Sequence, residues 1–191
     1  MEKDNVIYSI IFVHTAETLK LLSRAQYDLF CKSNLYIRTV ISIVLIFVSI
    51  NFLDKWYGPL MLLYGAYLLL SKYMQADYTS RKLVKTIEES GKPFPKSRYD
   101  FFNDRMEVYR LDDGSNSLID TLYYKDAKGI YDDFVNYYIF RDNFGGYVIP
   151  KVSLRDKEDE FREFIEKRTY KEMKSKLPPV VRLIRKITRN K

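Results

Sequence analysis

The spacing of hydrophobic residues changes several times along the chain, and each change predicts a different kind of element. Residues 5–14 contain VIYSIIFV, a run of β-branched and aromatic side chains that predicts a short strand. Thr15 is then placed to cap a helix that carries Glu17 in its first turn. From there to about Asn34, apolar residues recur at intervals of three and four, which predicts an amphipathic helix. The recurring residues are Leu19, Leu22, Ala25, Leu29 and Phe30.

Two long runs without charge follow, at residues 39–53 and 56–71. Neither run has the polar face that an exposed helix of this length normally shows. They hold 15 and 16 residues, between the roughly 20 of a membrane-spanning helix and the roughly 10–14 of a buried core helix. We expect a transmembrane hairpin over residues 35–74, and the alternative is a two-helix core element of a soluble protein. The residues expected to anchor it at the membrane interface are Arg38, Trp56, Tyr57 and Lys72, whose two cations would extend the segments by reaching outward.

The charges around this hairpin predict its orientation. Basic residues precede and follow it, whereas its turn carries only Lys55 beside Asp54. The positive-inside rule then places both termini in the cytoplasm. The single Cys31 has no partner for an internal disulfide and agrees with a reducing compartment. We expect Cys31 to be a small buried side chain, and a lipid anchor is the alternative.

The second half of the chain has a different pattern. The hairpin's last helix is expected to continue to Glu89, where Gly91 and Pro93 end it. Short β-rich runs then alternate with turn-forming residues, which predicts antiparallel strands joined mostly by hairpins. A final helix is expected from about Asp156, with Ser153 as its cap. The strands are expected at residues 99–103, 106–111, 117–124, 129–134, 137–141 and 147–151.

Together these elements predict an α+β membrane protein, in which a two-helix transmembrane hairpin carries a small antiparallel β-barrel or sheet capped by a C-terminal helix. A meander closed by one helix is the layout of pleckstrin-homology-like (PH-like) domains. Six strands are one too few for that barrel, so we hypothesise that the N-terminal strand, residues 6–13, pairs back to complete it. The expected divisions are residues 1–34 (strand and helix), 35–74 (hairpin), 75–92 (connecting helix), 93–177 (PH-like domain) and 178–191 (basic tail).

The positive charge of the protein is concentrated at its C-terminal end. Residues 167–191 carry ten Lys and Arg against one acid, so this segment contributes +9 to a net charge of +7. On a helical wheel its cations oppose its apolar residues, which is typical of a helix that lies on an anionic lipid surface. Docking against the protein itself or a partner is the alternative, and nucleic acid is disfavoured. The residues of this surface are Arg182, Arg185, Lys186 and Arg189 with Leu183, Ile184 and Ile187.

The remaining reactive residues point to no catalytic, cofactor or metal site. One Cys and one His cannot form a zinc site of the usual ligand set within one chain. Asp112 and Asp113 precede Gly114 and suit a hairpin turn better than a calcium loop. Asp132 and Asp133 are consecutive in an expected strand, so they should face opposite sides. His14 has no evident nucleophile nearby in the sequence, and neither G-x-G-x-x-G nor G-x-x-x-x-G-K occurs.

Residues 122–168 contain GIYDDFVNYYIF, then YVIPK, then the acidic-led DEFREFIEKR. This segment resembles the C-terminal domain of the YcxB-like family of bacterial membrane proteins. The most distinctive positions are Tyr147, Ile149, Pro150 and Lys151. Members usually carry a basic residue after that lysine, where this chain has Val152. The resemblance implies a membrane-anchored PH-like fold in the bacterial cell membrane, as a multi-pass protein, and it implies no established reaction.

These patterns predict a binding module rather than an enzyme. We expect a membrane-anchored, cytoplasm-facing PH-like domain that presents a surface to protein or lipid. The expected partners are the lipid bilayer and its anionic surface, together with a membrane-protein partner. The alternative is an accessory or regulatory subunit of a larger membrane assembly, such as a transporter, in which the hairpin helices form the interface.

Overall fold

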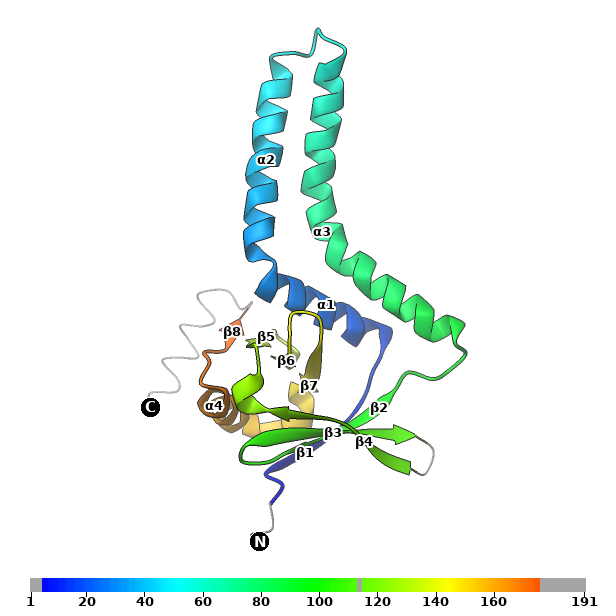
Figure 1. Ribbon diagram of the computed structural model, residues 1–191, viewed down its shortest axis with the longest axis vertical. Helices are drawn as coiled ribbons and strands as arrows, with labels where there is room; N and C mark the ends of the chain where they lie inside the picture. The colour runs from blue at the N-terminus through cyan, green and yellow to red at the C-terminus, as the bar shows by residue number, and fades with distance from the viewer. Residues whose placement is uncertain (1–4, 113–114, 176–191) are drawn as a thin grey trace.

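The computed structural model describes residues 5–112 and 115–175. The strands form a body from which a long helical hairpin projects (Figure 1). In chain order, the elements are β1 (Tyr8–Val13), α1 (Ala16–Phe30), α2 (Lys32–Ile50), α3 (Tyr57–Glu89), β2 (Lys96–Phe101), β3 (Arg105–Asp112), β4 (Ser115–Tyr123), the 3₁₀ turn η1 (Tyr124–Asp126), β5 (Gly129–Asp132), β6 (Asn136–Phe140), β7 (Gly146–Pro150), the 3₁₀ segment η2 (Lys151–Lys157), α4 (Glu158–Thr169) and β8 (Lys174–Ser175).

The strands form two sheets, with the orders β1-β2-β3-β4 and β7-β6-β5-β8. Strands β2, β3 and β4 pair antiparallel in sequence, as do β5, β6 and β7, which confirms the expected hairpin-joined strands. The N-terminal strand does pair back: Tyr8 lies opposite Phe101 and Val13 opposite Lys96. The hypothesised pairing of residues 6–13 is therefore confirmed, but it completes a four-stranded sheet and not the expected seven-stranded barrel. A register shift in β4 after Leu118 marks a β-bulge at the free edge of the first sheet.

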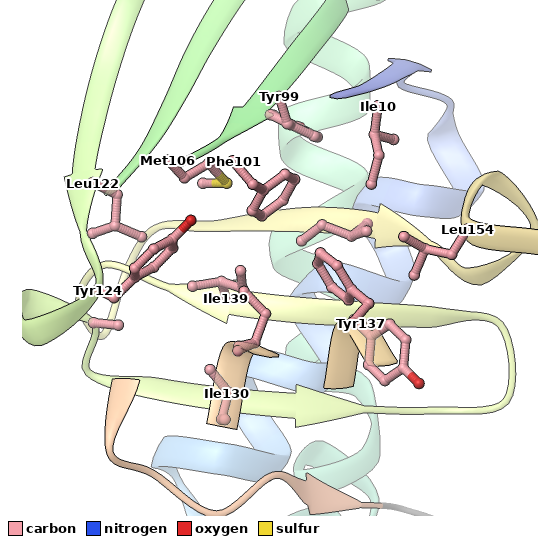
Figure 2. Packing of buried hydrophobic residues seen from close by; sticks show 14 of the residues in the cluster. Ile10, Tyr99, Phe101, Met106, Leu122, Tyr124, Ile130, Tyr137, Ile139 and Leu154 are labelled. Carbon is pink, nitrogen blue, oxygen red and sulfur yellow. The ribbon is translucent and has the colours of Figure 1, made fainter. Parts of the chain in front are cut away.

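The main core lies between the two sheets and is closed by α4. Figure 2 shows Tyr99, Phe101 and Met106 of the first sheet facing Ile139 and Tyr137 of the second. Helix α4 adds Phe161, whose ring meets those of Tyr8 and Phe101 edge-on at 5.2 and 5.1 Å. Because β1 contributes buried side chains here, the N-terminal strand is part of the same core as the C-terminal helix.

Helix α1 covers the other face of the second sheet. Its residues Ala25 and Leu29 pack against Tyr138 and Val148 in a separate apolar cluster. All five residues of β6 are buried, because this strand has the main core on one side and α1 on the other. Thr15 caps α1, as predicted from the sequence. Its side chain also forms a capping box with Thr18.

Helices α2 and α3 run side by side away from the body, and α1 lies between them and the strands (Figure 1). Helix α3 is continuous over 33 residues. Its first half forms the hairpin with α2, and its second half turns to run along α1. It ends at Glu89, and Gly91 follows with a φ of +65°, the left-handed conformation expected of a residue just after a helix.

No helix in the described ranges is both long and apolar enough to cross a membrane. The predicted transmembrane hairpin is therefore wrong, and so is the multi-pass location in a bacterial cell membrane with both termini in the cytoplasm. The physical reason is length. At about 1.5 Å per residue, runs of 15 and 16 uncharged residues reach only about 22–24 Å, against about 30 Å of hydrocarbon. Arg38 does not extend the run outward, because its Nη1 donates to Oε1 of Gln75 at 2.9 Å.

Three boundaries also differ from expectation. The helix expected to reach Asn34 ends at Phe30, and α2 begins after Cys31. The last helix begins at Glu158, not near Asp156, because Arg155 has a φ of +52° and interrupts the helical path, so Ser153 caps nothing. Strand β8 was not expected, since two residues are too few to leave a sequence pattern.

Candidate interaction surface

The α2–α3 hairpin exposes large apolar side chains on all of its outward sides. Phe47 is 72 % exposed on α2, Leu63 is 67 % exposed on α3, and Trp56 is 80 % exposed at the tip. Single exposed apolar residues are ordinary, but a contiguous patch of more than a few hundred Å² marks an interaction site in most proteins. From α2 through the turn to Met74 of α3, the exposed apolar residues are Tyr36, Ile37, Val40, Ile41, Ile43, Val44, Phe47, Val48, Ile50, Phe52, Leu53, Trp56, Tyr57, Leu60, Leu63, Tyr64, Tyr67, Leu70 and Met74.

Small residues between the helices explain why so many large ones face outward. Ser42 and Ser49 of α2 are fully buried, and Gly65 of α3 is buried against α2, whereas the buried Gly58 packs against the backbone of the turn at Phe52. Ser42 Oγ donates to the carbonyl oxygen of Gly65 at 2.5 Å. A Cβ on Gly65 would lie 2.9 Å from Cγ1 of Ile46. The helices therefore pack closely through small residues, and the hairpin has little room to bury its own large ones.

The large outward residues fall into rows with alternating intervals of three and four. On α3 the row consists of Tyr57, Leu60, Tyr64 and Tyr67, which we call the α3 row. On α2 the row consists of Tyr36, Val40, Ile43, Phe47 and Ile50, which we call the α2 row. A 3-4 repeat of apolar residues is the pattern by which one helix packs along another at a shallow angle. Each helix of the hairpin thus carries a helix-packing surface on the side away from its neighbour.

Charged side chains lie at both ends of the hairpin, and at the tip they lie beside exposed aromatic side chains. At the tip, Lys55 lies 3.5 Å from Asp54, and both side chains are well exposed. The ring of Tyr57 contacts those of Trp56 and Phe52, with centroids 5.9 and 5.8 Å apart. The apolar surface therefore extends over the tip, where Asp54 and Lys55 are its charged neighbours.

At the base, an ion-pair cluster joins α1 to the second half of α3. Arg24 donates two hydrogen bonds to Asp77, at 2.8 and 2.9 Å, and Lys20 lies 3.7 Å from the same carboxylate. These hydrogen bonds raise the pKa of Arg24 and lower the pKa of Asp77. Below this cluster, Asp28 accepts a hydrogen bond from Tyr131 Oη at 3.2 Å. The hairpin is thus tied through α1 to the second sheet.

The residues expected at the membrane interface do not form one site. Arg38 lies at the base and Trp56 and Tyr57 at the tip, so the hairpin separates them. The side chain of Lys72 lies outside the described part of the molecule. The expected lipid surface of Arg182, Arg185, Lys186 and Arg189 with Leu183, Ile184 and Ile187 also lies outside the described residues.

The most distinctive residues of the family resemblance, at positions 147 and 149–151, make contacts within the fold. Ile149 is fully buried in β7, and Tyr147 Oη donates to Asp120. Lys151 is only 4 % exposed. Its Nζ lies 3.5 Å from Asp132 Oδ2, donates to the carbonyl oxygen of Asp133, and sits 4.7 Å above the ring of Tyr137. Pro150 ends the strand just before Lys151, and the neighbouring Val152 is exposed.

Asp132 and Asp133 act separately, as their adjacent positions predicted. The carboxylate of Asp132 is fully buried and faces Lys151 and Arg162, the latter at 3.8 Å. The carboxylate of Asp133 instead accepts backbone hydrogen bonds from the turn that follows and one from Tyr138 Oη at 2.6 Å.

One cluster could not be found from the sequence. Nε2 of His14 lies 3.4 Å from both Ser97 Oγ and Tyr99 Oη, because β1 pairs with β2 across more than 80 residues of chain. Burial lowers the pKa of His14 and raises that of Tyr99, so both are neutral near pH 7. Nothing in the sequence indicated this contact, since only the strand pairing brings the residues together.

The described residues contain no group of three or more His, Cys, Asp or Glu side chains that could hold a metal ion. A cleft of about 290 Å³ lies between β1 and η2. Its walls include Arg155, Asp156 and Lys157, so one acidic side chain stands between two basic ones in the sequence. The exposed apolar surface of the hairpin is thus the most pronounced feature with which the described molecule could bind something else.

Comparisons with known proteins do not identify the chain: no protein-family model, curated protein or solved structure matches it. The similarity to the YcxB-like family therefore stays a prediction. The candidate surface stands on the geometry of the hairpin alone.

Proposed function

We propose that this protein is a binding module, in which the β-strand body presents the α2–α3 hairpin to the apolar helices of a larger protein assembly. The observation that carries the proposal is the exposure of large apolar side chains on both outward sides of the hairpin, with Phe47 at 72 % and Leu63 at 67 %. A helix that is apolar all round is stable only when it is buried on all sides. Of the roles predicted from the sequence, this one corresponds to the accessory subunit.

The shape of the exposed surface favours helices as the occupant. The α2 row and the α3 row each repeat at intervals of three and four, which matches a helix lying alongside at a crossing angle of about 20°. A partner helix of about 15 residues would cover the apolar length of about 22 Å. It would leave Asp54 and Lys55 at the tip in water, where an exposed ion pair is not penalised by desolvation.

The body of the protein supports this role because it does not need the hairpin for its own core. The core residues between the two sheets come from the strands, α4, η1, η2 and the connections beside them, and those under α1 come mainly from α1 and the second sheet, so neither cluster includes a described residue of α2 or α3. Ion pairs of Arg24 and Lys20 with Asp77 then hold the base of the hairpin in place. The body can therefore act as a rigid base that orients the binding surface.

Site-specific photo-crosslinking in the cells that make the protein tests the proposal. A photoreactive residue would replace Phe47 on α2 or Leu63 on α3, and Val152 or Phe144 as controls. These control side chains are 83 % and 89 % exposed and lie on the body. They are therefore as accessible as the hairpin positions but lie outside the proposed binding surface. We expect adducts at 47 and 63 whose crosslinked peptides map to apolar helices, and none at the controls.

Two outcomes would overturn the proposal. One is that positions 47 and 63 give adducts with lipid and none with protein, which would assign the surface to a lipid phase. The other is that all four positions give the same adducts, which would show that the hairpin contacts nothing specifically. Replacing Phe47 or Leu63 by glutamate should also remove the partner from the purified assembly, while Val152→Glu should retain it.

A further inference from the structure

The α3 row differs in chemistry from the α2 row, and this difference indicates what covers it. The α2 row is mostly aliphatic, whereas Tyr57, Tyr64 and Tyr67 dominate the α3 row. Tyr64 and Tyr67 are 56 % and 63 % exposed, and their rings stack with centroids 6.5 Å apart and planes at 24°. Their hydroxyl groups therefore lie on the surface that a partner would cover.

We propose that the α3 row binds the α3 row of a second copy of this chain, so that two hairpins associate side by side in parallel, about a two-fold axis that runs along the helices. This inference rests on the proposed function, because it names one of the helices that cover the hairpin. A two-fold interface uses the same patch on both copies, so that patch has to be self-complementary. A tyrosine hydroxyl both donates and accepts a hydrogen bond. Tyrosines on facing rows can therefore satisfy one another, whereas a wholly aliphatic helix would bury the hydroxyl groups without partners.

The area of the row agrees with a reversible dimer. The large side chains at its centre and flank, Leu60, Leu63, Tyr64, Tyr67 and Leu70, are each 54–67 % exposed. Burying a large apolar or aromatic side chain removes roughly 100–200 Å² from water, so the exposed part amounts to about 100 Å² each. Five side chains on each of two copies then bury about 1,000 Å², the lower limit for a specific interface. We therefore expect dimerisation that depends on protein concentration.

The spacing of the row adds a second, independent requirement. Residues that face the partner recur at intervals of three and four, with Leu63 and Leu70 flanking them, while the remaining residues face α2 or the far side of the hairpin. Gly65 faces α2 and is buried, although it directly follows Tyr64. A contact between two α3 rows should therefore appear at positions 60, 64 and 67 and be absent at positions 62 and 69.

A cysteine scan of the full-length protein tests the inference. Cys31 would first be replaced by serine, and single cysteines would then be placed at positions 60 to 69 and oxidised at micromolar concentration. We expect disulfide-linked dimers at 60, 64 and 67 and at least tenfold less at 62 and 69. Phe47→Cys on the α2 row and Val152→Cys on the body serve as controls for random collision.

A second measurement separates contact from collision. The Tyr64→Glu and Tyr67→Glu variants should shift the sedimentation of the protein from dimer to monomer, with at least a tenfold weaker association constant. Val152→Glu should leave it unchanged. Equal disulfide formation at all scanned positions, or unchanged sedimentation of both variants, would overturn the inference. If photo-adducts at Phe47 and Leu63 with another protein persist in that case, the proposed function stands and only the second copy is excluded; if those adducts are also missing, both fail.

Discussion

Replacing Lys151 by methionine tests the buried ion cluster that joins β5, β7 and α4. Lys151 is 4 % exposed and Asp132 is fully buried, with 3.5 Å between Nζ and Oδ2. Methionine has a similar length and keeps most of the packing against Tyr137. It removes the cation, however. The carboxylate of Asp132 then keeps its contact with Arg162, which lies 3.8 Å away.

The expected loss is large because a fully buried carboxylate loses a buried cationic partner. Removing one member of a buried ion pair reduces the free energy of unfolding by about 3–5 kcal/mol. A protein of this size shifts its melting temperature by about 2–4 °C per kcal/mol, so we expect a decrease of about 6–20 °C. A loss of this size is a considerable part of the roughly 5–15 kcal/mol by which a domain is stable.

The assay is urea and thermal unfolding followed by far-UV circular dichroism, because the only tryptophan, Trp56, lies at the hairpin tip and does not report on the strands. A second variant, Lys151→Met with Asp132→Asn, removes both charges. We expect it to be more stable than Lys151→Met alone, since no buried charge is left without its partner. Lys85→Met is the matched control, because Lys85 and Glu89 form a well-exposed pair on α3.

Two results would refute this reasoning. The first is a Lys151→Met protein as stable as the control variant, which would mean that the lysine does not balance Asp132. The second is a double variant whose loss equals the sum of the losses of Lys151→Met and Asp132→Asn, each measured as a single variant, since a coupled pair must depart from additivity.

Three further predictions test other parts of the fold. Gly65→Val should lower the free energy of unfolding by about 1–3 kcal/mol, because a Cβ there already lies 2.9 Å from Ile46; urea unfolding followed by Trp56 fluorescence measures it, and an unchanged urea midpoint would contradict the close helix packing. Burial lowers the pKa of His14 below 6.5, so folding favours the neutral ring and stability should fall as the pH drops below about 6.5 toward the lower value in the folded protein; an NMR titration of this single histidine with a midpoint at or above 6.5 would exclude it. Leu29→Ala should cost about 2–5 kcal/mol, measured by thermal unfolding, because Leu29 is buried between α1 and the second sheet; a loss below 1 kcal/mol would show that α1 does not hold the body.

Local signals in the sequence were sufficient for most individual elements. The alternation of β-branched and aromatic residues with turn-forming residues placed the strands from β2 to β7 within a few residues of their observed bounds. The cap at Thr15 and the left-handed Gly91 were likewise predictable, because capping and helix termination depend on residues only a few positions apart. The strand at residues 6–13 was recognisable by composition, although its partner was only a hypothesis.

The residues of the candidate surface could be identified from the sequence, but their structural role could not. Both uncharged runs of the hairpin were evident, yet their lengths lie between those of a spanning helix and a core helix, so the interpretation as membrane spans was wrong. Which of these residues face outward depends on Ser42 and Gly65, since their contact decides the side on which α2 and α3 meet. The α2 row and the α3 row therefore follow from the packing of two helices, not from either helix alone.

The sequence by itself determined where helices and strands form, that the chain carries two apolar helices, and that no motif for phosphate or metal binding accompanies them. Only the tertiary structure decided that β1 completes a sheet with β2, that Lys151 is buried beside Asp132, and that His14 meets Ser97. The physical reason is the range of the forces involved. Propensities, caps and hydrophobic periodicity act over a few residues, whereas burial and charge pairing depend on which distant segments the folded chain brings together.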